Sequence, residues 1–189
     1  HLVLANAMKD LLTDSCDYVL AGGVQPSLLV LELMLFCKIK AMSRHPELRP
    51  FDKDADGTML GEGLGIVVLR RKKDAERDGN RIYALIKGIG TASDGRAHGL
   101  LAPRLEGQIL AIQRAYQNAG VDPRSVGLIE AHGTGIPLGD VTEMAALTKV
   151  FGPRNGGRPT CGVGSVKSMI GHCRSAAGIA GIIKAVLAL

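Results

Sequence analysis

The stretch VGLIEAHGTG (residues 126–135) begins as an apolar run and ends in a turn with one histidine and two glycines. Residues 126–131 are predicted to form a buried strand, which breaks at His132. The stretch CGVGSVKSMIGH (161–172) has a similar design, with a short strand at residues 161–166 followed by a loop that ends at His172. Open α/β sheets carry reactive groups at the carboxyl ends of strands, where loops begin. The two stretches therefore predict an α/β fold with histidines at two strand ends.

The rest of the chain alternates in the same way. Apolar residues at helical spacing predict helices over residues 1–12, 26–40, 105–118, 141–150 and 176–189. Continuous apolar runs predict further strands over residues 17–24, 63–70 and 82–90. Fully apolar strands between helices indicate an α/β fold with buried, largely parallel sheets. The charged loop at residues 78–82 is the best candidate for a boundary between two parts.

Composition excludes several classes of protein. The 189 residues are 46% hydrophobic and 22% charged, the balance of a folded domain. The net charge of +5 is spread along the chain, and only 3% of residues are aromatic, which argues against nucleic-acid binding. The longest uncharged run, residues 18–31, is too short to cross a membrane. The four cysteines are far apart without a C-x-x-C pair, which favours reduced thiols in a cytosolic protein.

Three motif-like stretches do not meet the requirements of their chemistry. The run from Asp52 to Gly57 resembles a calcium loop, but position 12 is Gly63 rather than glutamate. In the stretch 162–168, Val166 stands where a phosphate-binding loop needs glycine before the lysine. Neither His132 nor His172 has a neighbouring ligand at the spacing of a zinc site. We therefore expect no metal.

The histidine-bearing turns remain as the candidates for chemistry. A lone histidine at a strand end is more often a hydrogen-bonded loop residue than a catalyst. Here two turns share one design, and Gly133, Gly135 and Gly171 allow positive φ beside the imidazoles. Pattern alone leaves the structural and the catalytic interpretations equally supported.

Three long blocks resemble a known family: FDKDADGTMLGEGLGIVVLRR (51–71), EAHGTGIPLGDVTE (130–143) and GVGSVKSMIGHCRSAAGIAGIIKAV (162–186). They are similar to the β-ketoacyl synthase (ketosynthase) domain of polyketide and fatty-acid synthases, and DYVLAGGV (17–24) and SDGRAHGLLAPRLEGQ (93–108) agree with it. The resemblance implies the thiolase fold, in which two similar halves stack in five α/β/α/β/α layers. Residues 1–81 would end the first half and residues 82–189 begin the second, so that the fold is incomplete and truncated at both ends.

The resemblance also implies a reaction, decarboxylative Claisen condensation. An acyl chain is held as a thioester on a cysteine, and a malonyl-type thioester on a carrier protein loses CO2 to give the attacking enolate. His132 and His172 would donate hydrogen bonds to the malonyl thioester carbonyl. Lys167 matches the family lysine, and Glu143 matches an acid that can form an ion pair with it. Thr134 would bind the phosphopantetheine arm.

The family nucleophile lies several residues before the position of His1, and none of Cys16, Cys37, Cys161 and Cys173 replaces it. The 189 residues alone are therefore expected to be inactive. Ile136 stands where the family usually has a second threonine for the pantetheine arm. The implied setting is a cytoplasmic homodimer that receives acyl and malonyl-type thioesters from an acyl carrier protein, with no bound cofactor, nucleic acid or membrane.

Two other functions compete with this interpretation. One is a non-catalytic, ketosynthase-like partner for dimerisation or chain-length control. The other is a thiolase-type or hydrolytic enzyme that uses Ser165 or Ser168 with His172, although no nucleophile-elbow pattern surrounds either serine. The presence of both histidines together with Lys167 and Glu143 favours the condensing enzyme.

Overall fold

The computed structural model describes residues 2–95, 102–152 and 161–189. The helices in these ranges are α1 (Leu2–Leu12), α2 (Val30–Lys38), α3 (Lys72–Arg77), α4 (Leu105–Ala119), α5 (Pro137–Phe151), α6 (Lys167–Ile170) and α7 (Ala177–Leu187), with the 3-10 turns η1 (Pro123–Ser125) and η2 (Arg174–Ala176). The strands are β1 (Val19–Gln25), β2 (Gly63–Leu69), β3 (Leu128–Glu130) and β4 (Gly162–Gly164). Residues 96–101 of the block 93–108, and residues 153–160, lie outside the described residues.

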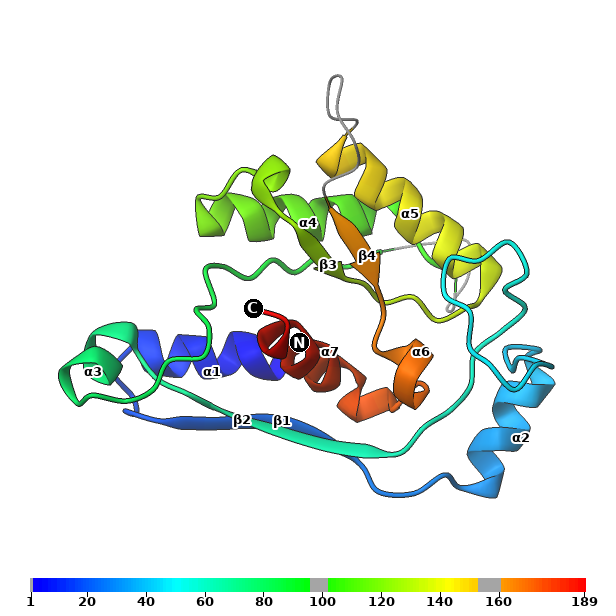
Figure 1. The fold of residues 1–189 in the computed structure, drawn as a ribbon, viewed down its shortest axis with the longest axis horizontal. Helices are drawn as coiled ribbons and strands as arrows, with labels where there is room; N and C mark the ends of the chain where they lie inside the picture. The colour runs from blue at the N-terminus through cyan, green and yellow to red at the C-terminus, as the bar shows by residue number, and fades with distance from the viewer. Residues whose placement is uncertain (1, 96–101, 153–160) are drawn as a thin grey trace.

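The elements form alternating layers of sheet and helix (Figure 1). Strands β1 and β2 make the first layer, α1 and α7 the second, β3 and β4 the third, and α4 and α5 the fourth. Helix α1 packs on β1, α7 contacts β1, β2 and β3, and α4 packs against α5. Helix α7 therefore lies between the two sheets and contacts both.

The two sheets differ in strand direction. Strands β3 and β4 are parallel, with Leu128 opposite Gly162, as the sequence predicts. Strands β1 and β2 are antiparallel, with Val19 opposite Leu69, so the prediction of largely parallel sheets is wrong for this layer. An apolar run indicates a strand, but it fixes neither the direction of the partner strand nor the burial of both faces, and Leu20, Leu64 and Ile66 are exposed here. Here α2 and a long loop return the chain in the opposite direction.

The strand predicted over residues 82–90 does not form a ladder in the part of the chain that the structure describes. The segment instead runs beside α4, where the backbone N–H of Ile89 donates to Asn118 Oδ1 at 3.2 Å. Gly90 permits this approach, because a Cβ there would lie 2.1 Å from the carbonyl oxygen of Ala111. Ile82, Tyr83 and Leu85 remain exposed. An apolar sequence favours extended backbone, but a strand also needs a partner.

Helix boundaries follow local sequence signals. Leu4, Ala7 and Leu11 are buried along one side of α1, which is the expected helical stripe. Helix α4 ends at Gly120, whose φ of 63° gives the predicted left-handed cap. Helix α5 begins at Pro137, four residues before the predicted start, because proline suits the first position of a helix. This additional turn carries residues of the site.

The parts of the chain before and after residue 81 pack against each other through backbone hydrogen bonds. The N–H of His172 donates to the carbonyl of Met59 at 2.7 Å, and the N–H of Gly61 donates to the carbonyl of His172 at 3.2 Å. The N–H of Gly57 donates to the carbonyl of Gly135 at 2.9 Å. Both histidine turns are therefore fixed by the loop before β2. Among the described residues, no helix is long and apolar enough to cross a membrane.

Candidate functional site

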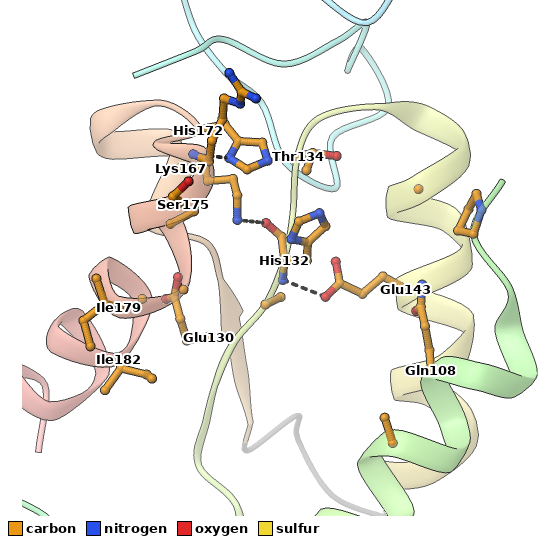
Figure 2. A pocket seen from close by; sticks show the side chains of 18 of the residues that line it. Gln108, Glu130, His132, Thr134, Glu143, Lys167, His172, Ser175, Ile179 and Ile182 are labelled. Carbon is orange, nitrogen blue, oxygen red and sulfur yellow. Dashed lines mark hydrogen bonds between the residues drawn. The ribbon is translucent and has the colours of Figure 1, made fainter. Parts of the chain in front are cut away.

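His132 and His172 lie next to each other (Figure 2). Because β3 and β4 are parallel neighbours, their carboxyl ends meet at the same sheet edge, and the chain reaches His132 and His172 shortly after these ends. The ring centroids are 5.7 Å apart, and the ring planes are perpendicular. Two turns of similar design thus meet at one site.

The histidines line a cavity of about 970 Å³. Its polar wall includes the predicted site residues His132, Thr134, Glu143, Lys167 and His172. Its apolar lining includes Ala111 and Ile112 on α4 and Ile179 and Ile182 on α7, two helices of different layers. All five predicted residues therefore line the same cavity.

Two carboxylates of α5 shape the turn that holds His132. Glu143 accepts the backbone N–H of His132 at 2.7 Å and that of Gly133 at 2.8 Å. Asp140 accepts the N–H groups of Thr134 at 3.1 Å and Gly135 at 3.2 Å. Four consecutive amides thus point at two acids spaced three residues apart on one helix face.

The glycines adopt the backbone conformation that the sequence predicts. Gly133, Gly135 and Gly171 have φ values of 42°, 76° and 75°. A Cβ at Gly135 would also lie 2.5 Å from the carbonyl oxygen of Gly57. Glycine is therefore required here by both the backbone and the close approach of the neighbouring loop.

The predicted ion pair between Lys167 and Glu143 is wrong. Within the described residues, no ion pair within 4.0 Å joins these side chains; Lys167 Nζ instead donates to the carbonyl of His132 at 2.5 Å. In Figure 2 the two side chains approach the His132 backbone from different directions, Lys167 at the carbonyl and Glu143 at the N–H. Both oxygens of Glu143 accept hydrogen bonds from backbone N–H groups. The sequence does not show which backbone groups lie near a charged side chain, so it could not predict these partners.

The tautomer of His172 follows from one hydrogen bond. The backbone N–H of Arg174 donates to His172 Nδ1 at 3.1 Å. Nδ1 is therefore the acceptor nitrogen, and the proton of the neutral ring is on Nε2. His172 can thus donate a hydrogen bond from Nε2 while it remains uncharged.

Burial and positive charge keep both rings neutral. Burial, followed by the nearby charge of Lys167, lowers the pKa of His172 to about 4. The same two causes, in the same order, lower the pKa of His132. Burial also lowers the pKa of Lys167, while Glu143 and Glu130 oppose that change. The site therefore presents neutral imidazole donors beside a buried amine at neutral pH.

The nucleophilic side chains of Cys173, Ser165 and Ser168 are buried or hydrogen-bonded to backbone carbonyls. Cys173 is fully buried beside Ala176 and Ile179, and burial raises the pKa of its thiol. The hydroxyl of Ser165 donates to the carbonyl of His132 at 3.1 Å, and that of Ser168 donates to the carbonyl of Ser165 at 2.8 Å. In the described ranges no hydrogen bond joins either serine to an imidazole, which argues against a serine hydrolase.

Sequence reasoning missed Asp140, Glu130 and Lys184. Asp140 is buried in the first turn of α5, and Pro137 at the start of that helix was the available signal. Glu130, at the end of β3, forms an ion pair with Lys184 of α7 at 2.7 Å. These two residues are 54 positions apart, so no local pattern indicates that they meet.

Comparisons with known proteins agree with this arrangement. Residues 1–75 match the family "Beta-ketoacyl synthase, N-terminal domain", and residues 83–189 match "Beta-ketoacyl synthase, C-terminal domain". The polyketide synthase PksN of Bacillus subtilis is 42% identical over the whole of this chain. The polyketide synthase ThaG of Burkholderia thailandensis is 42% identical over 97% of this chain. The chain spans only 4% and 3% of the length of these two relatives. A polyunsaturated fatty acid synthase component of Thraustochytrium sp. is 41% identical over 97% of this chain, which spans 7% of that relative.

Solved structures agree in fold. The ketosynthase from module 6 of the bacillaene synthase of Bacillus subtilis matches with a TM-score of 0.92 and 38% identity, covering 97% of this chain and 33% of that chain. The ishigamide ketosynthase/chain length factor matches with a TM-score of 0.88 and 35% identity, covering 99% of this chain and 44% of that chain. These neighbours confirm the predicted thiolase-like α/β fold. The chain belongs to the β-ketoacyl synthase family.

Proposed function

We propose that this chain carries the decarboxylation half of a ketosynthase active site, which acts in the decarboxylative Claisen condensation of polyketide or fatty-acid synthesis. The observation that carries the proposal is the pair of perpendicular imidazoles, 5.7 Å apart, in a cavity with a buried lysine. Burial lowers the pKa of both rings, which supports donation of hydrogen bonds by neutral imidazoles. Such preorganised donors stabilise negative charge that develops on an oxygen.

The substrate would be a malonyl-type thioester on the phosphopantetheine arm of an acyl carrier protein. His172 Nε2–H and a ring nitrogen of His132 would donate to the thioester carbonyl oxygen. The bond to the carboxylate then breaks, CO2 leaves, and its electron pair becomes an enolate that these donors hold. The enolate carbon attacks an acyl thioester, and the thiolate of a cysteine in the longer protein is the leaving group.

Two further residues would support this step. The positive charge of Lys167 lies close enough to lower the pKa of both rings and would also favour the enolate. Thr134, buried in the turn, accepts the N–H of Ile136 at 3.4 Å, which leaves its own O–H to donate to the phosphopantetheine arm. Ile136 offers no hydroxyl for that arm, so Thr134 would provide the contact from this turn.

The same proposal includes an acyl carrier protein as partner, which the relatives among polyketide and fatty-acid synthases support. It also includes a homodimer and a cytoplasmic location. A non-catalytic partner is the second candidate, and one neighbour is a ketosynthase/chain length factor. The neutral histidines and the buried lysine favour catalysis, because a purely structural partner needs no donors aimed into a cavity.

The test is His172→Ala in the longer protein that contains this chain. We expect loss of malonyl decarboxylation and of condensation, with acyl loading onto the cysteine largely intact, because loading depends mainly on the thiolate. Release of labelled CO2 and mass spectrometry of the acyl-enzyme measure the two steps separately. His45→Ala is the matched control, since His45 lies in a loop outside the cavity lining. Equal loss of loading and decarboxylation would contradict the proposed role.

A further inference from the structure

Glu130 joins three elements of the site through its two carboxylate oxygens. Oε1 accepts the backbone N–H of Val166 at 2.6 Å, and Oε2 pairs with Lys184 Nζ at 2.7 Å. Val166 directly precedes Lys167, at the start of α6. One side chain thus connects the end of β3, the turn that carries Lys167, and α7.

Space for this contact is provided by glycines. A Cβ at Gly181 would lie 3.0 Å from Glu130 Cγ, and a Cβ at Gly164 would lie 3.3 Å from Lys184 Nζ. The Glu130 side chain is only 12% exposed, and that of Lys184 is 31% exposed. Burial with two short charge-assisted contacts makes this pair different from an ion pair at the surface.

The Glu130–Lys184 ion pair holds the backbone just before Lys167, whereas the ammonium group of Lys167 is held at the other end of its side chain. Lys167 Nζ is bound to the carbonyl of His132, while the N–H of the preceding residue is bound to Glu130. If Lys184 is removed, the charge of Glu130 is no longer neutralised and can act on the Lys167 ammonium instead. If Glu130 is neutralised, the turn loses a charged acceptor at its start.

We propose that Glu130 and Lys184 are positioning residues, which hold the Val166–Lys167 turn so that the Lys167 ammonium stays on the His132 backbone. Lys184 does this from α7, away from the reacting groups. This inference rests on the proposed function for its effect on rate, but the placement and charge of Lys167 can be measured independently of activity.

The variants are Lys184→Met, Glu130→Gln, the double variant and the conservative Lys184→Arg, all in the longer protein that contains this chain. Lys72→Met is the matched control, because the exposed side chains of Lys72 and Glu76 pair at 3.3 Å on α3. For Lys184→Met we expect about a tenfold lower kcat for malonyl decarboxylation, since one charge of a buried pair is left alone. The KM should change little. Lys184→Arg should restore the rate, and the double variant should lose less than the sum of the two single changes.

A second readout separates positioning from a merely structural role. Competitive acetylation with acetic anhydride, followed by mass spectrometry, gives the pH at which Lys167 becomes reactive. Glu130 raises the pKa of Lys167, so this pH should fall in Glu130→Gln. It should rise in Lys184→Met, where Glu130 has lost its partner. General loosening of the fold would not move the two variants in opposite directions.

Each outcome decides a different claim. If wild type does not decarboxylate malonyl thioesters, the proposed function fails, and the acetylation profiles still decide the positioning role. If the Lys184 and Glu130 variants behave like Lys72→Met in both measurements, the positioning role is refuted. A fall in rate at every pH with unchanged Lys167 reactivity also refutes it, because the pair then contributes only to stability.

Discussion

Replacement of Glu143 by glutamine tests whether this residue acts through the backbone of His132. The Glu143 carboxylate accepts two amides, at 2.7 and 2.8 Å. Glutamine keeps one acceptor oxygen and places an NH2 group against the other amide, so one charge-assisted hydrogen bond is lost and the remaining one becomes a weaker, neutral hydrogen bond. Such a bond contributes about 1.5–3 kcal/mol, and the lower end applies here because His132 is exposed to the cavity.

If the lost hydrogen-bond energy raises the activation free energy by the same amount, about 1.5 kcal/mol corresponds to about a tenfold lower kcat for malonyl decarboxylation. Glu143→Ala removes both bonds, and we expect roughly twice that free-energy loss, or about a hundredfold lower kcat. The assay follows CO2 release in the longer protein, and urea denaturation measures stability in parallel. Glu106→Gln is the control, because Glu106 pairs with Arg104 on an exposed part of α4.

The reasoning would be refuted if both Glu143 variants matched Glu106→Gln in rate. It would also be refuted if Glu143→Gln and Glu143→Ala lowered kcat equally. The hydrogen bond to the remaining oxygen of glutamine would then contribute nothing to the rate. An effect through Lys167, as the ion-pair hypothesis requires, would remove the same charge in both variants and so predict equal losses.

Three further results are expected. The pKa of His172 is about 4 in the folded protein against an ordinary value of 6.5, so the unfolded chain binds more protons between these values; stability should fall as the pH drops from 6.5 to 4, and urea titrations should show a weaker fall in His172→Ala. Gly135→Ala should destabilise more than Gly79→Ala in thermal denaturation, because both positions have positive φ and carry about 1–2 kcal/mol of strain, whereas only Gly135 has a carbonyl oxygen in the way. The isolated 189 residues should not condense acyl and malonyl carriers, and should associate through the exposed β1–β2 residues Leu20, Leu64 and Ile66; size-exclusion chromatography that gave a monomer with condensing activity would contradict this.

The sequence predicts most of the helices and the residues of the site, for identifiable reasons. The stripe Leu4, Ala7 and Leu11 and the cap Gly120 are local patterns, which depend on the backbone geometry of one element. The approach of His132 and His172 follows from a general rule on the carboxyl ends of parallel strands. Family resemblance added Lys167, Glu143 and Thr134, which local patterns alone do not distinguish from surface residues.

The wrong predictions concern which segments or side chains contact each other, and not which residues lie in the site. Residues 82–90 have the composition of a strand, but a ladder depends on a second segment elsewhere in the chain. Lys167 and Glu143 have opposite charges, and yet both bind backbone groups of one residue. Glu130 and Lys184 do form an ion pair, and nothing local connects them. Long-range pairing is set by the three-dimensional packing, so periodicity in a single sequence does not reveal it.

The polar turn of His132 and the apolar residues of α4 lie on different elements of the cavity wall, so each can be changed without the other. The acids of α5 hold the His132 turn of the polar wall, whereas Ala111 and Ile112 of α4 make no hydrogen bond to either histidine among the described residues. Substitutions on α4 can therefore widen or narrow the cavity without changing the hydrogen bonds that hold the His132 turn. Under the proposed function, an engineer who wishes to change which acyl groups the site accepts should begin with this helix.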